Sequence, residues 1–189
     1  MRNFSTWVLL IALGVFLHGH PAQAQNATPG AVNLKVAILD LTLIRRQALV
    51  VKSVREQLTS YQDGFRQSIQ KEDEALKAAN QELAKKRTLL SPEAFAQERR
   101  TFEQKVVQVQ KLVQSSKVAL DQVQAKAMVE VEKTLNGIIT GIAEQQNITL
   151  ILRRDVTILA SRSFEITAAV LEELDKQMPT VKVEKPVIK

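Results

Sequence analysis

The sequence contains no cysteine among its 189 residues, and its only histidines are His18 and His20. Disulfides and zinc sites of the usual Cys/His kind are therefore excluded. Both histidines lie in an N-terminal segment that has the pattern of an export signal. Once that segment is removed, neither an imidazole nor a thiol remains for a Ser-His-Asp or Cys-His catalytic group. There is also no Gly-rich phosphate loop, so we expect no enzyme, no cofactor and no use of ATP.

Aromatic residues are also scarce, at 4% of the chain, with one Trp and one Tyr. This composition favours helix surfaces and thin apolar seams over a thick globular core. The formal net charge of +6 could indicate nucleic-acid binding. The chain offers no aromatic platform on which bases could stack, however, so we expect no nucleic-acid partner.

The N-terminus predicts an export signal. Arg2 precedes the apolar run "WVLLIALGVFL", and the small-x-small pattern "AQA" ends at Ala24. The apolar run is shorter than the roughly 20 residues that span a bilayer. We predict a signal peptide over residues 1–24, cleaved after Ala24, followed by a flexible leader over residues 25–34. An uncleaved anchor is the alternative.

Two long helical segments flank Pro92, each with apolar residues at the alternating spacing of four and three that marks a heptad seam. The seams mirror each other about a point between Pro92 and Glu93. This symmetry predicts an antiparallel helical hairpin, an arm over residues 46–142 with its tip near residues 91–93. Ser91 would cap the second helix, and Pro92 suits its first position. The seam residues are Phe65, Leu76, Leu83, Leu90, Phe95, Phe102, Val109 and Leu120.

Two alternatives to the hairpin remain, namely coincidence between independent heptad tracts and one long helix kinked at Pro92. With about 45 residues in each helix, the hairpin would be about 70 Å long. Near Val131 the seam has an extra step of four, which rotates the apolar stripe. We expect the second helix to leave its partner there and to join a thicker body.

That body is predicted over residues 35–45 and 143–178. It would contain a strand at Lys35–Leu41, a hairpin of two strands in "NITLILRR" and "VTILAS", and a final helix capped by Thr167. Residues 179–189 would form a loose tail. The fold class is therefore α+β, with a long helical hairpin projecting from a small β-rich body. The predicted body core comprises Val36, Ile38, Leu150, Leu152, Ile158, Val170, Leu171 and Leu174.

A body of about 45 residues rarely buries enough apolar surface to stabilise itself. We therefore predict a homo-oligomer in which several copies share one core. A monomer with its own small core is the alternative.

Four blocks, taken in their order along the chain, resemble the Skp/OmpH family of periplasmic chaperones. They are "KVAILDL", the heptad hairpin, "NITLILRRDVTILA" and "SFEITAAVLEELD". The resemblance implies a periplasmic homotrimer whose three arms surround a cavity. It also implies an ATP-independent holdase that binds unfolded outer-membrane proteins and prevents their aggregation. Members commonly have a Gly-containing bend soon after the first strand, but Leu43–Val54 lacks Gly and Pro. That bend would be absent or replaced by a continuous helix entry.

The tip carries five cations, Lys85, Lys86, Arg87, Arg99 and Arg100. In the hairpin register Lys86 opposes Arg99, which should splay the tip or send both heads to solvent. These cations could bind clients or an anionic surface of lipid or lipopolysaccharide, or they could simply solvate a helix end. A structural coiled-coil adaptor that links envelope components is the alternative function.

Overall fold

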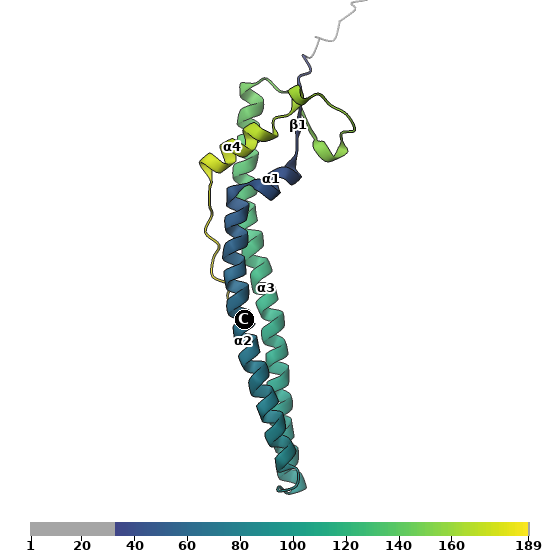
Figure 1. The fold of residues 1–189 in the computed structure, drawn as a ribbon, viewed down its shortest axis with the longest axis vertical. Coiled ribbons are helices and arrows are strands. Elements are labelled where there is room, and N and C mark those ends of the chain that lie inside the picture. The colour runs from purple at the N-terminus through teal and green to yellow at the C-terminus, as the bar shows by residue number, and fades with distance from the viewer. Residues whose placement is uncertain (1–32, 189) are drawn as a thin grey trace, which may run out of the picture. The chain divides into compact units, whose positions relative to one another are not determined.

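The computed structural model describes residues 33–188, and residues 34–189 form one compact unit. The predicted signal peptide, its cleavage after Ala24 and nearly all of the predicted leader lie outside the described residues. Figure 1 shows a body of short elements at one end of a pair of long helices. The elements are β1 (Val36–Leu39), α1 (Leu41–Gln47), α2 (Leu49–Lys86), α3 (Pro92–Gln145), β2 (Leu150–Arg153), η1 (Arg154–Val156), η2 (Arg162–Phe164) and α4 (Thr167–Gln177).

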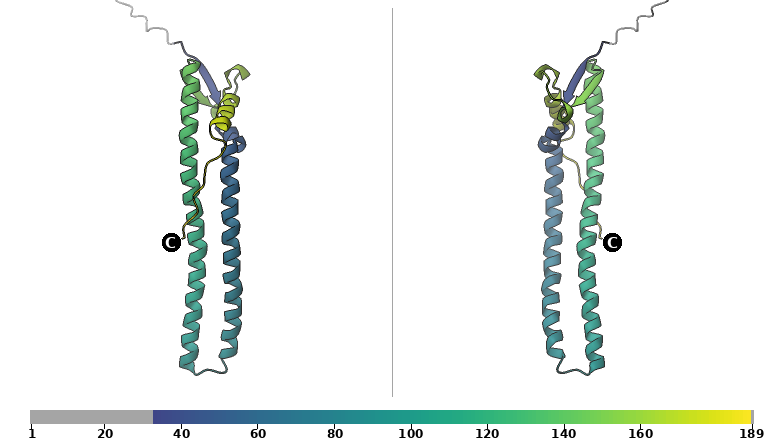
Figure 2. Two further views of the ribbon diagram at one scale, coloured as in Figure 1. Left: turned by 90° about the vertical axis from the view of Figure 1, so that its left-hand side faces the viewer. Right: turned by 90° about the vertical axis from the view of Figure 1, so that its right-hand side faces the viewer.

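The long helices α2 and α3 lie side by side and run in opposite directions (Figure 2). They contain 38 and 54 residues, respectively, rather than equal numbers. At 1.5 Å per residue they are about 57 Å and about 81 Å long. The difference arises because α3 continues past the start of α2 and into the body. Among residues 33–188, no helix combines the length and the apolar character needed to cross a membrane.

The start of α3 follows the sequence signal at Ser91 and Pro92. The Ser91 hydroxyl accepts a hydrogen bond from the Ala94 N–H at 3.3 Å, and Pro92 occupies the first turn, where no N–H is required. The Ser91 carbonyl accepts the first helical bond from Phe95 at 2.9 Å. The predicted cap of the second helix is therefore confirmed.

Seven of the eight predicted seam residues lie on α2 or α3 and are partly or fully buried, whereas Leu90 lies in the turn between the helices and is exposed. Leu76 and Val109 line the same hollow between the helices, and Leu58 shares a buried cluster with Ala127. Ser116, one of the polar residues within the apolar series, is buried. Its hydroxyl donates to the Leu112 carbonyl at 2.7 Å, which satisfies it within its own helix.

The sheet differs from the prediction. β2 pairs in parallel with β1, with Val36 opposite Leu150 and Leu39 opposite Arg153. The predicted second strand of a hairpin, Val156–Ser161, is not formed. Tight two-residue hairpin turns need residues with positive φ, which Arg154 and Asp155 do not adopt, and η1 forms instead. The two strands are far apart in sequence, and the long helices between them supply the crossover that a parallel pair requires.

The chain bends after α1 without a glycine or a proline. Ala48 adopts φ −54° and ψ 133° and is fully buried, so it separates α1 from α2. Its own side chain cannot cap α2. The Asp175 carboxylate of α4 instead accepts a hydrogen bond from the Leu49 N–H at 2.7 Å. The bend is therefore held by a residue that follows it by more than a hundred positions.

The body core is larger than the predicted body, because the ends of both long helices contribute to it. Val131, Leu135 and Ile138 of α3 pack in one buried cluster with Val170 and Leu174 of α4. These α3 residues follow the extra step in the heptad pattern, as expected for a helix that joins a thicker body. The same cluster contains residues of β1, α1, the bend and the first turn of α2, namely Ala37, Leu39, Ile44, Ala48 and Val50.

The start of α4 and the end of α3 both differ from what the sequence predicts. The Thr167 hydroxyl does not cap α4; it accepts a hydrogen bond from the Asp40 N–H at 2.9 Å and thereby ties α4 to the end of β1. Asn147, with φ 53°, ends α3. The Asn147 and Ile148 N–H groups donate to the Glu144 and Ala143 carbonyls at 3.1 and 2.8 Å, which is a Schellman ending.

The predicted loose tail is instead an ordered, extended segment, which we call the strap and define as residues 179–188. It runs back from α4 along the groove between α2 and α3 (Figure 2). Val183 is 1% exposed. The prediction of a loose tail was wrong because the strap is stabilised by contacts with the two long helices rather than by any helical stripe of its own.

Candidate functional site

The cations of the tip lie beside carboxylates. The Lys85 and Glu82 side chains are 2.7 Å apart, and Lys86 and Glu98 are 3.1 Å apart across the helix pair. Arg99 lies 3.5 Å from Glu103 on its own helix. Lys85 donates a hydrogen bond to Glu82, and this bond, with the attraction of the Lys85 charge, lowers the pKa of the Glu82 carboxyl.

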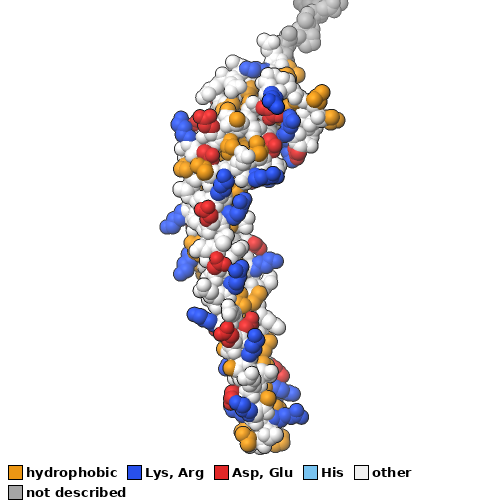
Figure 3. Space-filling view, in the orientation of Figure 1, with side chains coloured by type: hydrophobic (Ala, Val, Ile, Leu, Met, Phe, Trp, Pro, Cys, Tyr) orange, Lys and Arg blue, Asp and Glu red, His pale blue; other side chains and the backbone are white. Residues whose placement is uncertain are grey.

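Lys86 and Arg99, the two opposed cations, both keep their side chains at the surface, at 41% and 61% exposed, and each is paired with a different carboxylate. Exposed pairs of this kind contribute little to stability, because water and salt screen them. Side chains of both signs are mixed along the arm, and hydrophobic side chains cover its end (Figure 3). Leu89 is 79% exposed there.

A row of exposed valines runs along the outside of α3. Val107, Val118 and Val129 are separated by eleven residues each, which is close to three helical turns, so they lie on one face about 16 Å apart. They are 47%, 42% and 61% exposed. They lie outside the heptad positions, so the heptad pattern in the sequence does not reveal them. They give the arm several small, separate apolar contacts.

The body also exposes apolar side chains. Three strongly exposed apolar residues follow β2: Val156 ends η1, and Ile158 and Leu159 lie in the irregular segment after it. Leu150 and Leu152 of β2 are about two-fifths exposed, at 42% and 38%. Within residues 33–188, β2 has a strand partner on one edge only.

Some of the predicted core residues of the body are therefore buried within one chain, and others are exposed. Ile38, Val170 and Leu174 are buried, and Val36 and Leu171 are partly buried. Leu150, Leu152 and Ile158 are exposed.

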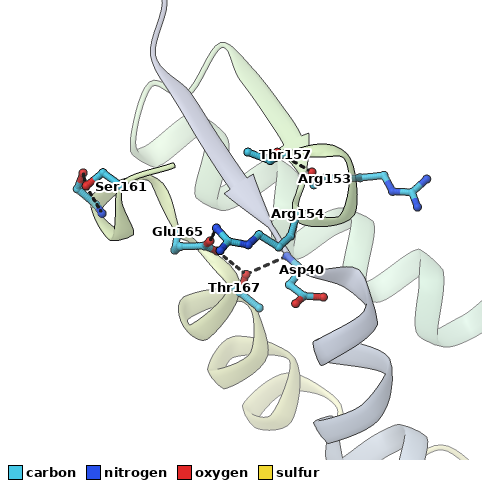
Figure 4. Close-up of polar contacts among 8 residues, drawn as sticks. Asp40, Arg153, Arg154, Thr157, Ser161, Glu165 and Thr167 are labelled. Carbon is cyan, nitrogen blue, oxygen red and sulfur yellow. Dashed lines mark hydrogen bonds and ion pairs between the residues drawn. The ribbon is translucent and has the colours of Figure 1, made fainter. Parts of the chain in front are cut away.

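Polar contacts fix the segment that carries the exposed residues (Figure 4). Arg154 pairs with Glu165 at 2.7 Å, and the Thr157 hydroxyl donates to the Arg153 carbonyl at 2.9 Å. The Ile166 N–H donates to the Ile38 carbonyl at 3.0 Å, next to an isolated bridge between Ile38 and Glu165. The apolar side chains thus project from a framework that is anchored to β1 on both sides.

Side chains of α2 hold the backbone of the strap by hydrogen bonds. The Gln57 side chain donates to the Val181 carbonyl at 2.8 Å and accepts from the Val183 N–H at 3.0 Å. The Tyr61 hydroxyl donates to the Val183 carbonyl at 3.3 Å. Sequence reasoning missed this site, although the alternation of apolar and charged residues in "VKVE" is a signal for an extended segment with one buried face.

No three acidic, histidine or cysteine side chains within residues 33–188 are grouped so that they could hold a metal ion. The features available for function are therefore surfaces: the tip, the valine row, the exposed apolar segment of the body and the groove that holds the strap.

The family model described as "Outer membrane protein (OmpH-like)" matches residues 35–174. The chain belongs to the OmpH-like family. The fold is similar to a crystal structure from Caulobacter crescentus CB15 that is described as a candidate outer membrane chaperone of OmpH-like type. The TM-score is 0.75 at 24% identity, over 84% of this chain and 94% of that one. No curated protein matches the chain.

The OmpH-like match ends at residue 174, within α4. Asp175, which caps α2, and the whole strap lie beyond it. The match therefore covers the sheet and the two long helices but not the segment that lies in the groove between them.

Proposed function

We propose that this OmpH-like protein is an ATP-independent holdase chaperone of the periplasm that binds unfolded outer-membrane proteins and prevents their aggregation. Membership of a family named for an outer membrane protein, and likeness to a structure described as a candidate chaperone, support this class of function. The observation that carries the mechanism is the arm itself. It is a long, thin pair of helices with small apolar contacts distributed along its length rather than one deep pocket.

Such an arm suits a client without fixed structure. The exposed valines of α3 and the apolar end of the tip offer weak contacts about 16 Å apart or more, which a flexible chain can occupy several at a time. Several weak contacts give useful total affinity by multivalency, while each one opens easily. Release then needs no nucleotide, because a client that folds into a membrane withdraws its apolar segments.

We further propose that the protein acts as a homotrimer formed through the body, with three arms around a shared cavity. The exposed Ile158 and Leu159 and the free edge of β2 support self-association, since exposed apolar residues beside an open edge favour pairing with another chain. The number three rests on the family resemblance. Leu150, Leu152 and Ile158 would then become buried in the core that the copies share.

The cations at the tip have a smaller role in this proposal. Arg87 and Arg100 add to the partly paired Lys85, Lys86 and Arg99, and exposed pairs exchange partners readily. We propose that they steer acidic client segments or the anionic surface of lipid or lipopolysaccharide toward the arm. Replacing all five by glutamine should slow client capture at low salt more than at high salt, because exposed charges are screened.

The test uses the mature chain, residues 25–189, and an outer-membrane β-barrel protein diluted from urea. Light scattering should show suppressed aggregation at near-stoichiometric ratio, without ATP. Unchanged aggregation would refute the holdase. Recovery of one stoichiometric folded partner from envelope extracts, with no effect on aggregation, would instead favour a structural adaptor.

A further inference from the structure

The groove between α2 and α3 near the body is built to hold an extended polypeptide. Its floor is a buried cluster of Val54 and Leu58 from α2 with Val123 and Ala127 from α3. The fifth member of this cluster is Val183 of the strap. A side chain from outside the helix pair thus completes the apolar packing between the two helices.

Most polar contacts in this groove are hydrogen bonds to the backbone of the strap rather than to its side chains. The Gln57 amide both donates to and accepts from the strap backbone, as a neighbouring strand would, and Tyr61 donates to a third backbone group. Only two side chains of the strap have polar contacts with the arm. Thr180 lies 2.7 Å from the Ser53 hydroxyl, and Glu184 lies 3.0 Å from Lys126.

Buried apolar residues and exposed charged residues alternate along the first part of the strap. Val181 is partly buried and Val183 is fully buried, whereas Lys182 and Glu184 are exposed. Farther along, Val187 lines the same hollow as Val118, one of the exposed valines of α3. The strap therefore connects the groove to the valine row.

We propose that this groove is a client-binding site for extended segments in which apolar and polar residues alternate, and that the strap occupies it in competition with the client. The proposal rests on the holdase function proposed above and assigns it a place on the arm. Strands of membrane β-barrels alternate in this way along their length. Backbone hydrogen bonds supply affinity for any sequence, and a pocket for alternate side chains supplies the preference.

The strap would then set how readily the chaperone accepts a client. A site that is covered for most of the time binds with an apparent affinity reduced by the fraction of time it is open. Weakly held segments would be displaced by the strap, which would favour release. Clients with strong alternation would displace it.

A reversible lock tests the proposal in the full mature chain. The Ser53 and Thr180 hydroxyls are 2.7 Å apart, and the chain contains no cysteine, so a Ser53→Cys, Thr180→Cys variant can fix the strap by one disulfide. The probe is a fluorescently labelled β-barrel protein diluted from urea. We expect the oxidised variant to bind it at least fivefold more weakly than the same variant after reduction. The reduced form should bind the client at least as tightly as the unmodified chain, because its strap has lost the hydrogen bond between Ser53 and Thr180.

Three further measurements separate the outcomes. Val183→Asp places a charge in the apolar cluster and should release the strap, leaving client affinity equal to or higher than that of the unmodified chain. Lys182→Asp, at an exposed strap position, should leave client affinity unchanged. Circular dichroism at matched concentration verifies that each variant retains its helices.

Equal client binding by the oxidised and reduced forms would overturn the groove proposal while leaving the holdase intact. If neither these forms nor the unmodified chain suppresses aggregation of the β-barrel protein, the holdase function itself is refuted.

Discussion

The Asp175 carboxylate is predicted to be a principal support of the bend between α1 and α2. It accepts from the first N–H of α2 at 2.7 Å, across 126 residues of sequence, and Ala48 offers no side-chain cap of its own. A hydrogen bond to a charged group contributes about 1.5–3 kcal/mol, and a lost N-cap costs about 0.5–2 kcal/mol. For Asp175→Ala we therefore expect a loss of about 2 kcal/mol in the free energy of unfolding.

Urea unfolding followed by circular dichroism measures this loss. All variants are compared at one protein concentration, because the proposed assembly would make stability depend on concentration. Asp175→Asn should lose less than Asp175→Ala, since the amide oxygen can still accept the bond although the charge is gone. Glu172→Ala removes a carboxylate from an exposed position of the same helix and should change the free energy by less than about 0.5 kcal/mol. Equal effects of Asp175→Ala and Glu172→Ala would refute the cap.

Three further predictions concern the core, the tip and the assembly surface. Leu174→Ala empties a fully buried site and should lower the free energy of unfolding by about 2–5 kcal/mol, whereas Leu89→Ala at the exposed tip should change it by less than about 0.5 kcal/mol; urea unfolding distinguishes them. Ser91→Ala removes the cap of α3 and should cost about 1 kcal/mol, seen as faster hydrogen exchange confined to the first turn, and unchanged exchange there would contradict the cap. Ile158→Asp should dissociate the proposed oligomer with its helices intact, whereas Val129→Asp on the arm should not; sedimentation velocity measures both, and an unaffected oligomer in Ile158→Asp would exclude this surface.

The long helices could be predicted from the sequence because their signals are local and repeated. The heptad positions recur over many turns, and Ser91 with Pro92 marks the start of α3 in two residues. The extra step near Val131 likewise indicates where α3 joins the body, since a change of period rotates the apolar stripe.

The body could be predicted only in part, because its contacts join residues that are distant in sequence. "KVAILDL" and "NITLILRR" both read as strands, yet nothing in either indicates that they pair in parallel with each other. The bend at Ala48 depends on Asp175, and the Thr167 hydroxyl is used by Asp40 instead of by its own helix. In each case a tertiary contact replaces the local signal.

The groove and its strap illustrate the same limit at the candidate site. Gln57 and Tyr61 read as ordinary polar residues on the outside of a helix, and only the three-dimensional structure shows that they hold Val181 and Val183. The strap has too few residues for a helical stripe. Its alternation becomes informative once the groove is known.

Native mass spectrometry of the mature chain, residues 25–189, tests the central claim most directly, because assembly and client capture appear in the same spectrum. The holdase account predicts a homotrimer on its own and, after dilution of an unfolded β-barrel protein from urea into the sample, a new species of three chains plus one client. A chain that stays monomeric, or an assembly that gains no client mass while the β-barrel protein aggregates, would contradict it.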